Sequence, residues 1–298
     1  MWGAEAGLEA LVTKASHAGA NRLQSPLGIC LSQFGSMIMA TLSIAIPRAE
    51  PIFYLRFAFR AAWIGLALIP LLPLHVFWRV FRLASPWPRL FLRVTARALG
   101  VRVTVFGTPL RKDVFYVANH LSWIDIPILG GITGTAFVAQ DGVRDWPLIG
   151  WLATLNRTIF ISRTDKLNVA NQVAELREAI SVNWSVALFA EGTTSDGRGL
   201  LPFKPSLFAT LAPPPKNLLI QPVLLDFGRT GPDVAWLGTE TGWESAWRAF
   251  TREGTYEVGV HFLDPYDPSL LGDRKEIALE ARARLAAALS QRLGFVVT

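Results

Sequence analysis

The stretch VFYVANHLSWID, residues 114–125, decides the fold that the rest of the chain is expected to complete. Its first five residues, Val114–Ala118, are all apolar or aromatic, which is typical of a strand buried on both faces of a sheet. Asn119 and His120 follow directly, so the strand would present an imidazole at its C-terminal end, where open α/β sheets place their ligands. Asp125 comes five residues after the histidine. The stretch therefore predicts an α/β fold with a histidine and a carboxylate at one edge of the sheet.

Outward from this stretch, short apolar runs alternate with longer helical patterns from residue 101 onwards. The predicted strands are Val101–Phe106, Val114–Ala118, Thr135–Ala139, Thr158–Ile161, Val186–Ala190, Leu218–Phe227, Val234–Leu237 and Tyr256–Phe262. The predicted helices are Pro147–Leu155, Lys166–Val182, Trp243–Thr251 and Arg274–Leu293. Strands separated by helices of this length favour an α/β domain with a mixed, mainly parallel sheet flanked by helices. No internal repeat or low-complexity linker interrupts residues 101–298, which we expect to form one catalytic domain.

The residues before this domain have a different composition. The whole chain of 298 residues is 51% hydrophobic and 17% charged, against roughly 25% charged residues in soluble domains. Between Pro51 and Lys112 there are ten basic residues and no acidic one, while the rest of the chain carries 19 basic and 23 acidic residues. The residues between these arginines are mostly apolar and aromatic, which favours a lipid surface over nucleic acid as the anionic partner.

Within this basic region, Ala61–Trp78 contains eighteen residues without a formal charge, near the short limit for crossing a bilayer. Pro70 and Pro73 interrupt it, so we expect a broken helix that dips into one leaflet. A basic amphipathic helix is predicted next, over about Pro88–Leu99, with a buried core helix as the alternative. We therefore divide the chain into a poorly defined segment 1–50, a membrane-embedded helical segment 51–100 and the domain 101–298.

The single cysteine, Cys30, excludes an intramolecular disulfide and any zinc site that needs several cysteines. A reduced active domain is therefore expected, at the inner (cytoplasmic) membrane and facing the cytoplasm. Whether the apolar segment spans the bilayer or enters only one leaflet stays open at this stage.

His120 and Asp125 are the candidate catalytic pair. A carboxylate five residues away, across a strand-to-helix turn, can reach the imidazole, set its tautomer and stabilise the imidazolium. A histidine so held accepts a proton from an alcohol while the alcohol oxygen attacks a thioester carbonyl. Two structural alternatives stay open: Ser122 and Asp125 fit a helix capping box, and Asp125 fits the cap of a helix that begins at Ile126.

Two further segments carry polar groups suited to a ligand. ALFAEGTTSDG, residues 187–197, is an apolar strand that ends in a loop with glycines and hydroxyls, and Lys204 follows it. Such a loop can hold a headgroup or a developing oxyanion, although ordinary turns use the same residues. The strand within Arg157–Arg163 is bracketed by arginines that suit an anionic headgroup, with a solvated edge strand as the alternative.

Taken in order, four blocks resemble those of the glycerolipid acyltransferase family: NHLSWID at 119–125, IFISR at 159–163, FAEGT at 189–193 and QPV at 221–223. The resemblance covers about residues 85–230. It implies that His120 is the general base and Asp125 its partner. It further implies a lyso-lipid acceptor, an acyl thioester donor on acyl carrier protein or coenzyme A, and no cofactor or metal. The implied contacts to the acceptor and its headgroup are Arg163, Glu191, Gly192, Thr193, Thr194 and Lys204.

The residue that follows Glu-Gly-Thr distinguishes between two candidate acceptor lipids. Relatives that act on lysophosphatidic acid usually have arginine there, whereas this chain has Thr194. The string EGTTSDG, with LPFK at 201–204, is instead similar to bacterial acyltransferases that complete ornithine-containing lipids. We therefore expect lyso-ornithine lipid as acceptor, with 1-acylglycerol-3-phosphate, or both lipids, as the alternative.

Two other functions fit these residues less well. A hydrolase of the α/β type would need a Gly-x-Ser-x-Gly nucleophile elbow, which the sequence does not contain. A non-enzymatic membrane-binding protein would explain the basic and apolar N-terminal region but not the two polar loops at strand ends.

Overall fold

The computed structural model describes residues 50–161, 174, 177, 178, 180 and 185–296. The chain divides into two compact units, Met1–Ile52 and Phe53–Thr298, and the first lies almost wholly outside the described residues. Arg163, most of the predicted helix Lys166–Val182 and nearly all of segment 1–50 also lie outside them. The predicted boundary between residues 100 and 101 stays a prediction.

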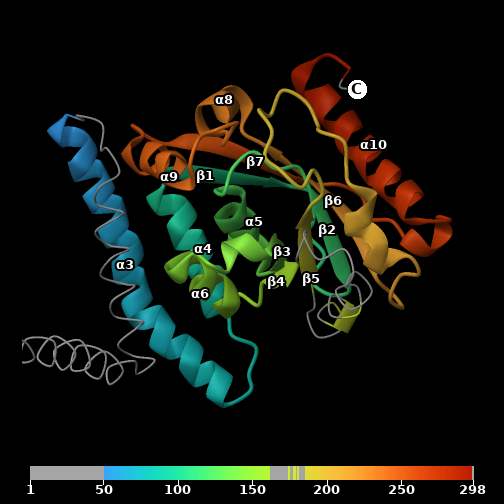
Figure 1. Ribbon diagram of the computed structural model, residues 1–298, viewed down its shortest axis with the longest axis horizontal. Helices are drawn as coiled ribbons and strands as arrows, with labels where there is room; N and C mark the ends of the chain where they lie inside the picture. The colour runs from blue at the N-terminus through green and yellow to red at the C-terminus, as the bar shows by residue number, and fades with distance from the viewer. Residues whose placement is uncertain (1–49, 162–173, 175–176, 179, 181–184, 297–298) are drawn as a thin grey trace, which may run out of the picture. The chain divides into compact units, whose positions relative to one another are not determined.

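A seven-stranded sheet forms the centre of the second unit, with the strand order β1-β7-β6-β2-β5-β3-β4 (Figure 1). Its strands are β1 Val101–Phe106, β2 Val114–Ala118, β3 Ala136–Gln140, β4 Ile159–Ile161, β5 Ser185–Phe189, β6 Leu219–Asp226 and β7 Tyr256–Phe262. Neighbouring strands are parallel except β6 and β7, which are antiparallel. The predicted mixed, mainly parallel sheet is therefore confirmed.

Strand β2 lies in the middle of the sheet, between β5 and β6. All five of its residues are buried because helices cover both faces. Tyr116 belongs to the apolar cluster on one face, and Phe115 and Val117 belong to the cluster on the other. This alternation follows from the two-residue period of a strand, and it directs the end of β2 into a well-packed site.

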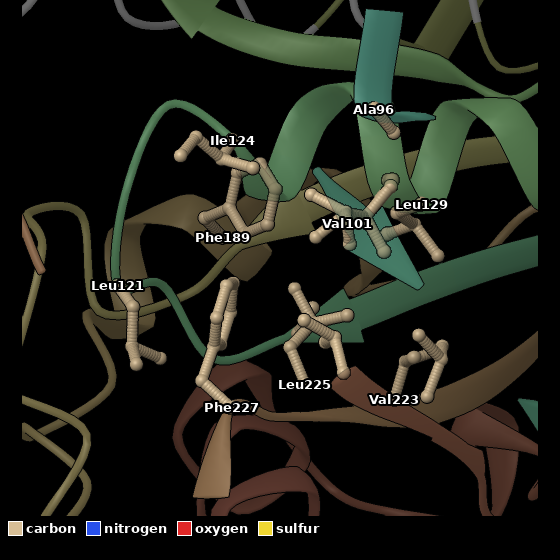
Figure 2. Packing of buried hydrophobic residues seen from close by; sticks show 14 of the residues in the cluster. Ala96, Val101, Leu121, Ile124, Leu129, Phe189, Val223, Leu225 and Phe227 are labelled. Atoms are coloured by element: carbon tan, nitrogen blue, oxygen red, sulfur yellow. The ribbon is translucent and has the colours of Figure 1, made fainter. Parts of the chain in front are cut away.

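Helices of the described chain flank the sheet on both sides. They are α3 Pro51–Val80, α4 Trp87–Ala98, α5 Asp125–Thr133, α6 Pro147–Leu155, α8 Gly231–Val234, α9 Gly242–Thr251 and α10 Arg274–Leu293. Short 3-10 turns lie at Asp141–Val143, Pro205–Leu211, Gly228–Thr230 and Pro268–Leu270. Figure 2 shows the cluster in which Ala96 of α4 and Leu129 of α5 pack with strand residues such as Val101 and Leu225. On the opposite face, Leu285 of α10 packs in the second cluster.

Helices α4 and α5 approach each other closely because α5 carries two glycines at the contact. A Cβ atom on Gly131 would lie 2.9 Å from the Cα and backbone N of Arg93, and one on Gly130 would lie 2.5 Å from a methyl of Leu92. The Arg93 Nε atom also donates to the Gly131 carbonyl at 3.1 Å. Side chains at the two glycines would force α4 away from the helix that begins at Asp125.

Most predicted elements among the described residues are confirmed within one residue at either end, but the strand Val234–Leu237 and the broken helix are not. Val234–Leu237 is wrong as a strand: α8 ends at Val234, and the backbone amide of Trp236 donates to the Leu121 carbonyl at 2.8 Å instead of joining the sheet. This run is apolar because Val234 and Ala235 are buried against the core, which a strand and a buried loop achieve equally. Helix α5 was not among the predicted helices; a helix that begins at Ile126 was given only as an alternative explanation for Asp125.

The apolar run Ala61–Trp78 lies within one continuous helix, α3, and not in the broken helix that the sequence predicted. α3 passes through both Pro70 and Pro73. Each proline removes a single backbone donor, and its restricted φ is close to the helical value, so the penalty stays local. With 30 residues the helix is about 45 Å long. Among the described residues it is the one helix long and apolar enough to cross a membrane, and an 18-residue window within it has a mean hydropathy of 1.8.

The N-terminal half of α3 is attached to α9. The Phe57 ring lies 5.2 Å from the Trp247 ring and 4.9 Å from the Phe250 ring, measured between centroids. The Arg60 guanidinium donates to the carbonyls of Ala249 at 2.7 Å and Phe250 at 3.3 Å. Other large apolar side chains of α3 are more than half exposed: Leu55, Phe59, Trp63, Leu66 and Ile69. One side of the helix therefore holds the domain while another suits contact with lipid.

Candidate active site

His120 and Asp125 lie together at the C-terminal end of β2. The His120 Nδ1 atom is 2.7 Å from the Asp125 Oδ2 atom. The same carboxylate oxygen accepts from the backbone amides of Leu121 at 2.7 Å and Ser122 at 3.0 Å. The Asp125 side chain is fully buried, so its position is set by the turn that it stabilises. The predicted contact between imidazole and carboxylate is present.

The structural alternatives for Asp125 do not account for this geometry. Helix α5 has Ile124 as its N-cap residue and no side-chain cap. Of the capping box, only the half in which the Asp125 carboxylate accepts from the Ser122 amide is present, because the Ser122 hydroxyl has no hydrogen-bond partner among the described residues. Asp125 instead folds back on the preceding turn and on the imidazole, which is the arrangement expected for an orienting carboxylate.

The backbone of His120 is held on both sides by the loop that follows β5. Its amide donates to the Glu191 Oε1 atom at 3.0 Å. Its carbonyl accepts from the Ser195 amide at 2.7 Å and from the Ser195 hydroxyl at 3.1 Å. The two loops at the ends of β2 and β5 are thus joined at the histidine, because parallel neighbouring strands end at the same edge of the sheet.

The imidazole ring is also fixed from one face. It stacks on the Phe189 ring with 4.1 Å between centroids and an interplanar angle of 12°. The His120 side chain retains 18% exposure. Since Nδ1 faces Asp125, the Nε2 atom is the nitrogen left to act on a substrate. Asn119 strengthens the same strand end, because its side-chain amide exchanges two hydrogen bonds with the backbone of Leu225 on β6.

Glu191 is buried, with 1% exposure. Its Oε2 atom accepts from the Leu201 amide at 3.1 Å, while Oε1 holds the His120 amide. Burial raises the pKa of Glu191 to about 7, and the backbone hydrogen bonds oppose that shift only in part. Both oxygens are engaged with the protein, so the geometry supports a positioning role for this carboxyl group; its predicted contact with the headgroup stays a prediction.

The other predicted acceptor contacts differ in placement. Gly192 adopts a positive φ of 67°, which turns the chain sharply after β5. Thr193 and Lys204 are exposed. The Thr194 hydroxyl donates to the Trp236 carbonyl, so it joins this loop to the segment after α8. Arg163 lies outside the described residues.

Three contributions to the site were missed in the sequence. Ser195 holds the His120 carbonyl, Phe189 stacks on the imidazole, and Trp236 binds the Leu121 carbonyl. Phe189 and Ser195 lie in the stretch 187–197 that the sequence singled out. The hydrogen bond from Ser195 to His120 spans 75 positions, however, and no local pattern of residues indicates it. Nothing in the sequence indicated the contact of Trp236, because the apolar run Val234–Leu237 is also typical of a strand.

Comparisons with known proteins show the family to which the chain belongs. A family model described as Acyltransferase matches residues 102–226. The chain is 32% identical over 250 residues to the lyso-ornithine lipid O-acyltransferase of Brucella abortus (strain 2308), which covers 77% of this chain and 91% of that protein. It is 34% identical over 97 residues to the 1-acyl-sn-glycerol-3-phosphate acyltransferase of Neisseria gonorrhoeae, which covers 33% of this chain and 38% of that protein.

Among solved structures, the fold is similar to the crystal structure of the 1-acyl-sn-glycerophosphate (LPA) acyltransferase PlsC from Thermotoga maritima. The TM-score is 0.60 at 20% sequence identity, and the match covers 83% of this chain and 97% of that one. At this identity the likeness concerns the fold alone.

Proposed function

Because the chain belongs to the acyltransferase family, we propose that it transfers a fatty acyl group from a thioester to the free hydroxyl of lyso-ornithine lipid. The observation that carries the catalytic part is the 2.7 Å contact between His120 Nδ1 and Asp125 Oδ2 at the end of β2. It makes Nε2 the proton acceptor and gives the resulting imidazolium a buried counter-charge.

This placement supports the following reaction. His120 Nε2 takes the proton of the acceptor hydroxyl while the hydroxyl oxygen attacks the thioester carbonyl carbon. A carbon–oxygen bond forms, the carbon–sulfur bond breaks, and the leaving sulfur takes the proton from the imidazolium. The products are an ester and a free thiol. General-base assistance of this kind contributes about 10²–10⁴-fold to the rate.

The choice of acceptor is supported by Thr194. At the position where relatives acting on lysophosphatidic acid usually have arginine, this chain has a hydroxyl that is engaged with the Trp236 carbonyl. No guanidinium therefore extends from this position of the loop to pair with a phosphate. The similarity to the lyso-ornithine lipid relative also extends over most of that protein, whereas the glycerophosphate relative matches over about a third of this chain.

The setting we propose is the inner membrane, with the active site facing the cytoplasm and α3 as the attachment. This is supported by the exposed apolar side chains of α3 and by the absence of acidic residues from Pro51 to Lys112. The acyl donor would be a thioester of acyl carrier protein or coenzyme A.

A transfer assay tests the function directly. The purified full chain is incorporated into phospholipid vesicles with a radiolabelled acyl thioester and either lyso-ornithine lipid or 1-acylglycerol-3-phosphate, and the products are separated by chromatography. We expect labelled ornithine lipid, at a rate at least 10²-fold lower in His120→Ala. Release of labelled free acid, or acylation of 1-acylglycerol-3-phosphate alone, would contradict the proposal. His17→Ala, at a histidine that precedes the matched residues 102–226, serves as the histidine control.

A further inference from the structure

An open groove of about 790 Å³ lies between the start of α3 and the segment that joins α8 to α9. Its charged lining differs from that of an anion site. Three arginines and three acidic residues surround it: Arg56, Arg248, Arg252, Asp233, Glu240 and Glu253. Apolar groups such as Phe53 and Leu237 complete the wall. A ligand that matches this lining needs both signs of charge and an apolar part.

Two of the arginines are already neutralised within the protein. Arg248 forms two hydrogen bonds with Glu240, at 2.9 Å from Nε and 2.7 Å from a terminal nitrogen, and it also binds backbone carbonyls. Arg56 lies 3.2 Å from Glu253. These pairs organise the groove, but their charges are satisfied by their neighbours.

The remaining two charges have no oppositely charged partner in the described part of the chain. Asp233 is exposed, and its side-chain carboxylate forms no ion pair or hydrogen bond there. The Arg252 guanidinium lies 4.6 Å from the centroid of the Tyr256 ring and donates to the Glu253 carbonyl at 3.2 Å. One free negative and one free positive group therefore line the same groove without pairing with each other.

One wall of the groove is hydrogen-bonded to the turn that carries His120. Ala235 and Leu237 line it, and Trp236 lies between them. The Trp236 amide donates to the carbonyl of Leu121, the residue after His120, and its carbonyl accepts from the Thr194 hydroxyl. A ligand in the groove is thus separated from both catalytic loops by a single stretch of backbone.

A second groove of the molecule has the opposite character. It lies between α4, α5 and β1, has a volume of about 600 Å³, and contains arginines but no acidic residue. That lining suits a ligand of negative charge alone. The contrast matters because an amino-acid headgroup carries an ammonium and a carboxylate, whereas a phosphate monoester carries only negative charge.

We propose that the groove beside α8 binds the zwitterionic headgroup of the acceptor, with Asp233 contacting the ornithine ammonium and Arg252 contacting its carboxylate. This inference rests on the proposed function and specifies how that acceptor is told apart from a phosphate lipid. Asp233 and Arg252 are specificity-determining residues in this scheme and take no part in the proton transfer at His120.

Kinetics with both acceptors test the assignment. Initial rates are measured with the purified full chain in mixed micelles, with lyso-ornithine lipid and with 1-acylglycerol-3-phosphate. Loss of one charge-assisted contact at a solvated site should raise KM for lyso-ornithine lipid about fivefold to tenfold in Asp233→Asn and in Arg252→Gln. The value of kcat should change by less than about twofold, because the lost contact stabilises the bound lipid equally in the ground state and in the transition state. Activity on 1-acylglycerol-3-phosphate should not fall in Asp233→Asn.

Matched controls are Asp264→Asn and Arg274→Gln, two exposed charges that do not line the groove. Both should keep the wild-type KM. An unchanged KM for lyso-ornithine lipid in Asp233→Asn and Arg252→Gln would overturn the groove assignment while leaving the proposed function intact. Absence of transfer to lyso-ornithine lipid by the wild-type enzyme would instead overturn the proposed function. Equal rises in KM for both acceptors would also contradict headgroup selection.

A modified acceptor separates the two contacts. Methyl esterification of the ornithine carboxylate removes the negative charge that Arg252 is proposed to bind. The ester should therefore be a poorer acceptor for the wild-type enzyme and for Asp233→Asn, but no poorer than the parent lipid for Arg252→Gln. Equal penalties in all three proteins would show that Arg252 does not contact this group, since coupled sites must give non-additive effects.

Discussion

Glu191 accepts a hydrogen bond from the backbone amide of His120 at 3.0 Å, across 71 positions of sequence. The second oxygen of the same carboxyl group holds the Leu201 amide at 3.1 Å. One buried side chain therefore connects the turn after β2 to both ends of the loop after β5. The imidazole is positioned by the meeting of these two loops, and not by β2 alone.

The buried Glu191 carboxyl group predicts a pH dependence of stability. Burial raises its pKa from an ordinary value of 4.5 to about 7, so the folded protein keeps a proton that the unfolded chain releases between these values. The stabilising contribution is complete below pH 4.5 and is lost as the pH rises through 7. Denaturant unfolding in detergent should therefore show a steeper loss of free energy from pH 5 to 8 in the wild type than in Glu191→Gln.

The difference between the two profiles should be on the order of 1–3 kcal/mol. Asp264→Asn, at an exposed position, provides the control and should follow the wild-type profile. Parallel profiles for the wild type and Glu191→Gln would mean that this carboxyl group does not titrate in the range stated.

Asp125→Asn is expected to reduce the transfer rate by at least 10²-fold while the protein stays folded. The asparagine oxygen can still accept from the Leu121 and Ser122 amides. It cannot stabilise the imidazolium by charge, and its amide favours the wrong tautomer of His120. Rate measurements and near-ultraviolet circular dichroism check both parts. A variant with near-normal turnover would remove Asp125 from the proposed mechanism.

Gly131→Ala should destabilise the protein, although alanine is the better helix former. Its Cβ would lie 2.9 Å from backbone atoms of Arg93, which move only if α4 moves. Overpacking of this kind costs about 1–3 kcal/mol, against roughly 1 kcal/mol gained in helix propensity. Gly142→Ala meets nothing within 4 Å and is the matched control. Thermal unfolding should give a lower Tm for Gly131→Ala than for the control; the reverse order would contradict close packing of α4 on α5.

Arg60→Ala should weaken the attachment of α3 more than Arg56→Ala does. The Arg60 guanidinium donates to the carbonyls of Ala249 and Phe250 near the C-terminus of α9, where helix carbonyls lack partners and attract a cation. Its removal should cost about 1.5–3 kcal/mol. Arg56 pairs with Glu253, whose side chain is 82% exposed, and such a pair contributes about 0–1 kcal/mol. Equal changes in Tm for the two variants would argue against this anchor.

How far the sequence predicted the structure depended on the range of the interactions. The continuous apolar run Val114–Ala118 and the helical pattern Arg274–Leu293 were found with their bounds, because burial of a regular element leaves a local pattern of apolar residues. Pro70 and Pro73 were overweighted, since a proline lowers the stability of a helix without ending it in every context. Val234–Leu237 was misread because an apolar loop and a short strand share one composition.

By itself, the sequence determined the class of fold, the order of the blocks and the pairing of His120 with Asp125, because five residues across a turn are a local relationship. The tertiary structure decided what surrounds that pair: the Glu191 and Ser195 contacts and the Phe189 ring. It also decided that Asp233 and Arg252 line the same groove. These depend on which strand ends become neighbours in the sheet, and that order arises from long-range packing that no local pattern of residues records.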